Sequence, residues 1–193
     1  MKYSNIKAIV FDFWGVFATF NAPVSAAIGL KGPVDKFNQD YYNLIKQHDL
    51  GQISEDEFLA AASKIFNVNL TVKHRYLFDD SDVNHKLIEI VKELKKKYKI
   101  GLISNTPREN TEQFLFKSGL DKLFDVLILS YEVKFRKPDF RIYQLAAKKL
   151  GLKPEKILFI DDHQKSLDGA VEVGMQVLLY EGEKTNKILE ELL

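Results

Sequence analysis

Six chemically active side chains follow apolar runs in this sequence, five of them directly where a run ends and one, a lysine, a few residues further on. In chain order they are Asp12, Ser104, Asn105, Lys137, Asp161 and Asp162. Together they supply three carboxylates, a hydroxyl, an amide and an ammonium group. Ligands of open parallel α/β sheets bind beyond the carboxyl ends of the strands. We therefore expect these groups to converge at one edge of a sheet.

Three carboxylates at one place indicate a bound cation, because they repel one another unless a positive charge neutralises them. The chain contains no cysteine, and oxygen ligands without a Cys or His cluster suit a hard ion such as Mg²⁺. We expect His163, which follows the acidic pair, beside the site or at the surface rather than on the metal.

Once the acidic charge is offset, Lys137, the Ser104 hydroxyl and backbone N–H groups make a site for an anion such as phosphate. An aspartate carboxylate in such a site can attack phosphorus and form an acyl-phosphate that water hydrolyses. Each residue alone is commonly a strand-end cap or a turn former. Agreement at four strand ends favours a functional site.

Short apolar runs predict the strands that position these residues. They are four to seven residues long, rich in β-branched residues, and lie at residues 6–11, 100–103, 126–129, 157–160 and 177–180. Their composition is typical of strands buried on both faces. Segments with helical spacing lie between them, a pattern that indicates a parallel sheet with crossover helices. The expected fold class is α/β with a doubly wound parallel sheet.

A long segment after the first strand interrupts this alternation. We assign residues 1–16 and 82–193 to the core and residues 17–81 to a small inserted helical cap. Within the cap, the sequence predicts one helix over residues 34–48 and another over residues 54–66. Ser54 and Glu57 stand at capping-box spacing at the start of the second helix.

Composition excludes several other classes of protein. The 193 residues include 28 Lys and Arg against 27 Asp and Glu, a net charge of +1. Such a balance offers no global field for binding nucleic acid or an anionic membrane. The absence of cysteine rules out disulfides and a thiol nucleophile. The first apolar run contains an aspartate and fits neither a signal peptide nor a membrane span, so we expect a soluble cytoplasmic protein.

Four motifs in order resemble those of the haloacid dehalogenase-like (HAD) hydrolase superfamily. They are VFDFWGVF with Asp12, LISNT with Ser104, RKPDFRIY with Lys137, and FIDDHQKSLDGA with Asp161 and Asp162. The region from SNT onward is most similar to the subgroup that includes bacterial sugar-phosphate phosphatases and the amino-terminal domain of soluble epoxide hydrolase. The resemblance covers nearly the whole chain.

That resemblance implies a Rossmann-like core, a helical cap after the first motif, and a Mg²⁺-dependent phosphatase that acts on a small phosphorylated metabolite. Asp12 would be the nucleophile that carries an aspartyl-phosphate. Asp12, the backbone carbonyl of Trp14, Asp161 and Asp162 would hold the metal. Ser104, Asn105 and Lys137 would bind phosphate, and Lys137 would also be catalytic. The sequence indicates neither which metabolite is used nor the oligomeric state.

Trp14 departs from the family pattern. Phosphatases of the superfamily usually have a second aspartate two residues after the nucleophile, which protonates the leaving group, and an indole cannot transfer a proton. Leaving-group protonation would then fall to water, the substrate or a cap residue. Because of this residue, one alternative is that the chain is a catalytically silent member of the superfamily that binds a phosphorylated ligand or a protein partner.

A 2-haloacid dehalogenase is the second alternative, because such enzymes have an aromatic residue at this position and need no metal. Aromatic side chains cluster in sequence around the nucleophile: Phe11, Phe13, Trp14, Phe17 and Phe20. Aromatic residues near a first strand more often pack in the core than line a pocket. Asp161 and Asp162 would repel a carboxylate substrate and a departing halide. Phosphatase chemistry is therefore the favoured hypothesis.

Overall fold

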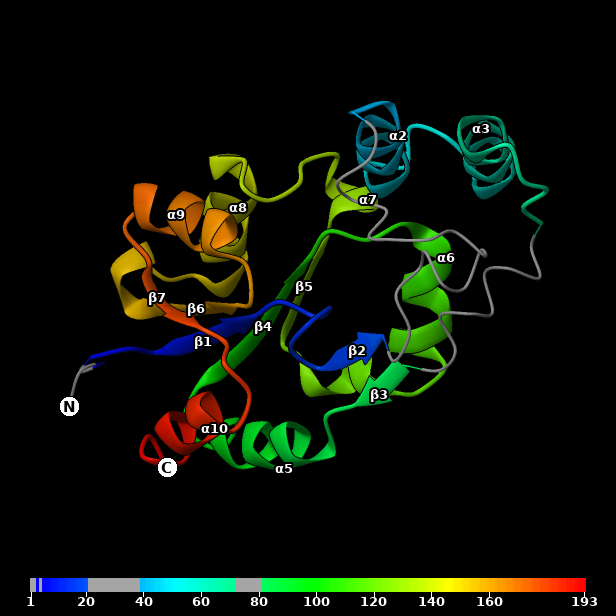
Figure 1. Cartoon of the computed structure of the whole chain (residues 1–193). Coiled ribbons are helices and arrows are strands. Elements are labelled where there is room, and N and C mark those ends of the chain that lie inside the picture. The colour runs from blue at the N-terminus through cyan, green and yellow to red at the C-terminus, as the bar shows by residue number, and fades with distance from the viewer. Residues whose placement is uncertain (1–2, 4, 21–38, 72–80) are drawn as a thin grey trace.

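The computed structural model of the chain describes residues 3, 5–20, 39–71 and 81–193. Its centre is a sheet of five parallel strands, in the order β5-β4-β1-β6-β7 (Figure 1). The strands are β1 (Ala8–Phe11), β4 (Lys99–Ser104), β5 (Val126–Leu129), β6 (Ile157–Asp161) and β7 (Gln176–Leu179). All five predicted strands are present within one or two residues of their expected ends, and the α/β fold class is confirmed.

Helices cover both faces of this sheet. The longer ones are α5 (His85–Leu94), α8 (Phe140–Leu150), α9 (Gln164–Glu172) and α10 (Glu183–Glu190). Short helical turns lie at α6 (Arg108–Thr111), η3 (Glu112–Phe116), η4 (Leu120–Leu123), α7 (Ser130–Val133) and η5 (Pro154–Lys156). In the described ranges, no helix is long and apolar enough to cross a membrane.

Alternating side chains of the strands build two separate apolar cores. In β1, Ile9 and Phe11 pack on the face covered by α5 and α10, whereas Ala8 and Val10 pack on the face covered by α8 and α9. All four side chains are almost completely buried. A strand buried on both faces explains why the sequence shows a continuous apolar run here rather than an alternating pattern.

The segment that we assign to the cap contains two helices, α2 (Gln39–Asp49) and α3 (Glu55–Phe66). The capping box of the second is confirmed: Glu57 N–H donates to Ser54 Oγ (3.3 Å), and Ser54 N–H donates to Glu57 Oε2 (2.7 Å). The first helix was expected from residue 34, but residues 34–38 lie outside the described ranges. A two-stranded antiparallel ribbon of β2 (Ala18–Phe20) and β3 (Ser81–Val83), which the sequence did not predict, connects the ends of the segment.

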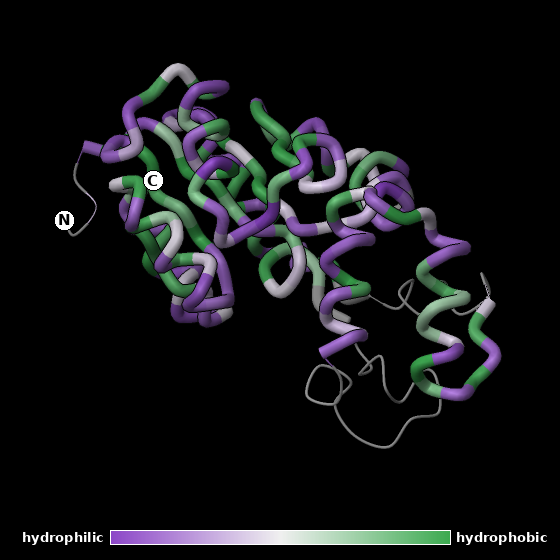
Figure 2. Tube along the Cα trace, turned by 90° about the horizontal axis from the view of Figure 1, so that it is seen from above, coloured by the Kyte–Doolittle hydropathy of each residue, from purple (hydrophilic) through white to green (hydrophobic). Residues whose placement is uncertain are grey.

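The two cap helices pack against each other at one end of the molecule (Figures 1 and 2). Tyr41, Leu44 and Ala62 form a small buried cluster between them. Figure 2 shows both helices with mixed polar and apolar positions, as expected of helices that bury only one side. The cap therefore has an apolar core of its own, separate from the two cores on the sheet.

Gly169 allows α9 to pack closely on the loop that follows Lys137. A Cβ atom at this position would lie 2.5 Å from the carbonyl oxygen of Pro138 and 3.0 Å from the ring of Tyr143. The carbonyl belongs to the backbone and cannot rotate away as a flexible side chain would. Glycine is therefore needed for the contact between this helix and the loop.

We predict that Gly169→Ala lowers the free energy of unfolding by about 1 to 3 kcal/mol, because the methyl group overpacks the contact. The sign is the test, since alanine inside a helix normally stabilises it by about 1 kcal/mol relative to glycine. Urea denaturation followed by circular dichroism measures the change. Glu172→Ala, exposed in the same helix, is the control and should change stability by less than about 0.5 kcal/mol. An equally or more stable Gly169→Ala protein would contradict this packing.

Candidate active site

The carboxyl ends of three adjacent strands meet at the centre of the sheet. Asp12 directly follows β1, Ser104 ends β4, and Asp161 ends β6. Lys137 comes from the loop between α7 and α8, after β5. The structure therefore brings together the side chains that the sequence placed at separate strand ends.

Lys137 lies between two of these carboxylates. Its Nζ atom is 2.8 Å from Asp12 Oδ1 and 2.5 Å from Asp161 Oδ2. All three residues are buried, with exposed fractions of 4% for Lys137, 7% for Asp12 and 0% for Asp161. One ammonium group thus lies between two buried carboxylates and offsets one of their two negative charges.

Asp12 is held through one of its two oxygens. Oδ1 accepts the N–H of Phe13 at 2.7 Å as well as the ammonium of Lys137, and neither contact involves Oδ2. Burial raises the pKa of Asp12 to about 7, although the charge of Lys137 lowers it. Burial alone would lower the pKa of Lys137, but Asp12 and Asp161 raise it, so this side chain is a firmly held cation.

Asp161 has contacts on both of its oxygens. Oδ2 accepts the Lys137 ammonium, and Oδ1 accepts the backbone N–H of His163 at 2.8 Å. The second contact ties the end of β6 to the start of α9. Asp161 therefore fixes the lysine and the following turn, which leaves Asp162 as the more open carboxylate of the pair.

Asn105, in the loop after β4, forms two hydrogen bonds with the backbone of Lys137. Its Oδ1 accepts the Lys137 N–H at 2.8 Å, and its Nδ2 donates to the Lys137 carbonyl oxygen at 3.1 Å. The sequence analysis assigned Asn105 to phosphate binding. In the structure, its side-chain amide binds both the backbone N–H and the backbone carbonyl of Lys137 and so fixes the position of the lysine.

Two buried oxygens at this edge have no hydrogen-bond partner in the described part of the chain: Ser104 Oγ and Asp162 Oδ1. Asp162 Oδ1 does lie 2.9 Å from His163 Nδ1, with which it forms an ion pair when the imidazole is protonated. The imidazole itself is 75% exposed, in agreement with its expected place beside the site. Buried polar atoms are normally paired, so these two oxygens mark where a ligand or an ion would bind.

Gly15 brings the loop after β1 against Asp162. A Cβ atom here would lie 2.2 Å from Asp162 Oδ2, and the backbone φ of +82° also favours glycine. The carboxylate of Asp162 is thereby placed beside the residue that follows Trp14. The sequence analysis did not single out this glycine; its position directly after the expected carbonyl ligand was the available signal.

The donor set at this point fits a hard cation. Ligand atoms of Asp161, Asp162 and His163 can lie within 4.8 Å of one another. Asp162 Oδ1 is buried with the exposed His163 imidazole 2.9 Å away, and the glycine leaves room for the loop of Trp14 to approach. Carboxylate and carbonyl oxygens are the ligands that Mg²⁺ prefers.

The aromatic residues around Asp12 pack with one another. Phe11, Phe13 and Phe17 are at most 4% exposed and belong to the core, as the packing interpretation predicted; the side chain of Phe20 lies outside the described residues. The indole of Trp14 makes edge contacts with Phe13 (4.8 Å between ring centroids) and with Phe114 (5.3 Å). These contacts fix an apolar ring two residues after Asp12, and its indole cannot transfer a proton.

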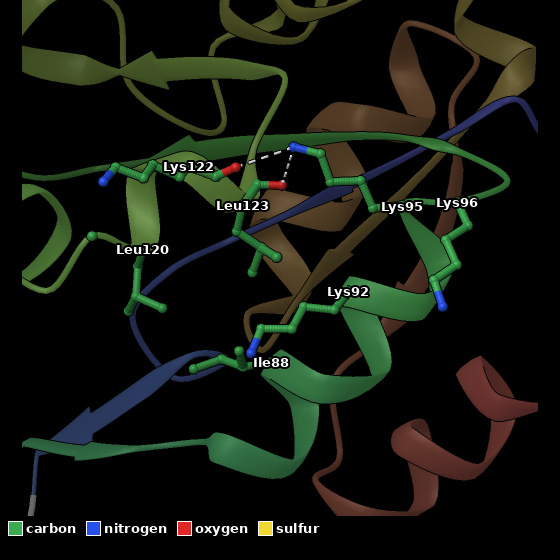
Figure 3. Close-up of a pocket in the computed structure, with 8 residues that line it drawn as sticks. Ile88, Lys92, Lys95, Lys96, Leu120, Lys122 and Leu123 are labelled. Atoms are coloured by element: carbon green, nitrogen blue, oxygen red, sulfur yellow. Dashed lines mark hydrogen bonds between the residues drawn. The ribbon is translucent and has the colours of Figure 1, made fainter.

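A surface pocket of about 380 Å³ lies at the opposite edge of the sheet (Figure 3). It is bordered by α5 and by η4, before the first residues of β4 and β5. One of its lysines, Lys95, donates to the carbonyl oxygens of Lys122 (3.2 Å) and Leu123 (2.8 Å), as the dashed lines show. It shares no residue with the constellation around Asp12.

Comparison with known proteins agrees with this geometry. The family model for haloacid dehalogenase-like hydrolases matches residues 6–174. The pyrophosphatase PpaX of Bacillus cereus (strain AH820) is 37% identical over 88% of this chain and 80% of its own length. The phosphorylated carbohydrates phosphatase of Thermotoga maritima is 33% identical, over 46% of this chain and 40% of its own length.

Among solved structures, a HAD-like family hydrolase of Porphyromonas gingivalis superposes with a TM-score of 0.82, with 25% identity and 98% of each chain covered. A HAD family enzyme of Bacteroides thetaiotaomicron, solved with magnesium and inorganic phosphate, has a TM-score of 0.74 and 19% identity, over 92% of this chain and 96% of its own. This second likeness shows the fold alone. Since the family model matches most of the chain, including every residue of the constellation around Asp12, the chain belongs to the haloacid dehalogenase-like hydrolases.

Proposed function

We propose that this hydrolase is a Mg²⁺-dependent phosphatase that cleaves a small phosphomonoester through a phosphorylated Asp12. The observation that carries the proposal is the buried contact of the Asp12 carboxylate with the Lys137 ammonium, 2.8 Å apart. A carboxylate alone at this depth would be a poor neighbour for an anionic phosphate, and the ammonium offsets its charge.

Asp12 Oδ2 is the attacking atom in this proposal. Oδ1 is fixed by Phe13 N–H and Lys137, so Oδ2 attacks phosphorus, the P–O bond to the leaving alcohol breaks, and an acyl-phosphate forms on Asp12. The Ser104 hydroxyl, buried and without a partner in the described residues, donates to a phosphoryl oxygen. Lys137 stabilises the negative charge that develops. Water then attacks phosphorus and restores the carboxylate.

Asp12, Asp162 and the backbone carbonyl of Trp14 are the residues that would hold Mg²⁺. The ion would offset the charge of phosphate and of the carboxylates around it. We assign Asp161 a second part beside the one expected from the sequence, since its oxygens also bind Lys137 and the turn at His163. It supports the site by holding the lysine.

The relatives indicate the substrate class. Two of the matching proteins are called a phosphorylated carbohydrates phosphatase and a D-ribitol-5-phosphate phosphatase, and another is the pyrophosphatase PpaX. We infer a small phosphorylated metabolite as substrate. The indole of Trp14 adds a restriction, because it cannot protonate the leaving oxygen.

Removing the Asp162 carboxylate should weaken Mg²⁺ binding more than tenfold, which corresponds to about 1.4 kcal/mol or more. Titration calorimetry of Mg²⁺ into wild-type and Asp162→Ala protein measures the change. Glu172→Ala removes an exposed carboxylate of α9 and should bind Mg²⁺ as the wild type does. Unchanged affinity in Asp162→Ala would refute the assigned metal ligand.

Turnover should depend steeply on the leaving group. Without an acid at residue 14, the enzyme lacks a contribution typically worth about 10² to 10⁴ in rate, and esters with poor leaving groups lose most. A panel that runs from p-nitrophenyl phosphate and acetyl phosphate to alkyl phosphates, with and without Mg²⁺, measures phosphate release.

In this panel the good leaving groups should be preferred, and both Mg²⁺ removal and Asp12→Asn should abolish release. A shallow dependence on leaving-group pKa would show that another group donates the proton. Halide release from 2-chloropropionate without metal, in the absence of phosphatase activity, would overturn the proposal in favour of dehalogenation. Binding of phosphate without turnover of any ester would favour a catalytically silent protein.

A further inference from the structure

The carboxyl-terminal end of cap helix α2 is bound to the loop that carries Lys137. Arg136 Nη2 lies 3.0 Å from Asp49 Oδ2, and Lys134 Nζ donates to the carbonyl oxygens of Leu50 (3.0 Å) and Gly51 (3.2 Å). These contacts join residues more than 80 positions apart in the sequence. The end of one cap helix is therefore fixed on the segment next to the catalytic lysine.

The Asp49–Arg136 ion pair is shielded from water. The side chains of Asp49 and Arg136 are 10% and 19% exposed. Burial raises the pKa of Asp49 to about 6, while Arg136 and Lys137 lower it. Asp49 is thus ionised at pH 8, and a buried pair of this kind is strongly disrupted when one partner is removed.

Lys137 is constrained from two directions. Asn105 holds its backbone N–H and carbonyl from the loop after β4. On the preceding residue, Arg136 is held by Asp49 from the cap. The side chain of Lys137 then reaches the two buried carboxylates, where a small displacement would lengthen contacts of 2.8 and 2.5 Å.

Ser130 connects the same point of the cap to the loop after β4. Its hydroxyl donates to the Asp49 carbonyl oxygen at 2.5 Å and accepts the N–H of Thr106 at 2.9 Å. Thr106 follows Asn105 directly. The backbone of Asp49 is therefore tied to the loop that grips Lys137, and its side chain to the residue before Lys137.

We propose that Asp49 is a positioning residue for Lys137: its ion pair with Arg136 fixes the segment that delivers the lysine and couples the seating of the cap to the catalytic site. The proposal rests on the function proposed above, because Lys137 must act on the transition state. Outside α2, the hydrogen bonds of Asp49 in the described residues are with Arg136 and Ser130, not with Asp12 or Lys137. The sequence analysis did not single it out.

Asp49→Asn is the direct test, since it removes the charge but keeps the shape and the backbone carbonyl that Ser130 binds. At pH 8 with saturating Mg²⁺, we expect kcat for p-nitrophenyl phosphate to fall by about tenfold to a hundredfold, the size of effect that misplacement by about 1 Å produces. KM should change by less than about threefold, because the lost interaction acts on the transition state. Thermal denaturation of each variant confirms that it is folded at the assay temperature.

Two further variants separate positioning from general support of the cap. Lys134→Met removes the contacts to Leu50 and Gly51 without affecting Arg136, and should keep kcat within about threefold of the wild type. Arg136→Gln should lower kcat as Asp49→Asn does, and the double variant should be no worse than either single one, as expected for residues acting as one unit.

Three results would overturn the proposal. The first is an Asp49→Asn kcat within about threefold of the wild type. The second is an equal loss in Lys134→Met, and the third is a loss confined to KM. A wild-type enzyme that hydrolyses no phosphate ester would refute the proposed function instead, so the two failures are distinguishable.

Discussion

The placement of one buried ammonium between two buried carboxylates is the constraint on which the rest of this structure depends. Charges are costly to bury, and a buried carboxylate left without its partner is more costly still. Asp12 and Asp161 end adjacent strands, and both are within 2.8 Å of the Lys137 ammonium. The fold must therefore deliver a lysine to this point from a loop that lies beyond β5.

Several features of the chain serve that delivery. Asn105 holds the backbone of Lys137, and Gly169 lets α9 approach Pro138, the next residue. The same ammonium explains why the adjacent residues Asp161 and Asp162 have different contacts. Asp161 is bound by the lysine, whereas Asp162 lies against Gly15, with the exposed His163 imidazole 2.9 Å from its Oδ1.

The features that could be predicted from the sequence are those that depend on a local pattern of residues. Continuous apolar runs predicted the five strands, and Ser54 and Glu57 predicted the start of α3. The polar residues after the strands predicted that Asp12 and Asp161 lie together at one edge of the sheet, whereas Lys137 lies in a loop after β5 and α7. Features that depend on contacts between distant segments could not be predicted in this way. The pairing of Asp49 with Arg136 spans 87 positions, and the different surroundings of Asp161 and Asp162 arise from a lysine and a glycine in other loops. The strands β2 and β3 have only three residues each, which is too short to show an alternating apolar pattern in the sequence.

Transfer of phosphate to Asp12 is the step on which the proposed function depends. The most direct measurement is acid quenching of a single turnover with ³²P-labelled acetyl phosphate and Mg²⁺, followed by peptide mapping. We expect a hydroxylamine-sensitive label on the peptide that contains Asp12, which is lost when Mg²⁺ is omitted and is absent from Asp12→Asn. Rapid phosphate release with label on another residue, or with full activity retained in Asp12→Asn, would contradict it.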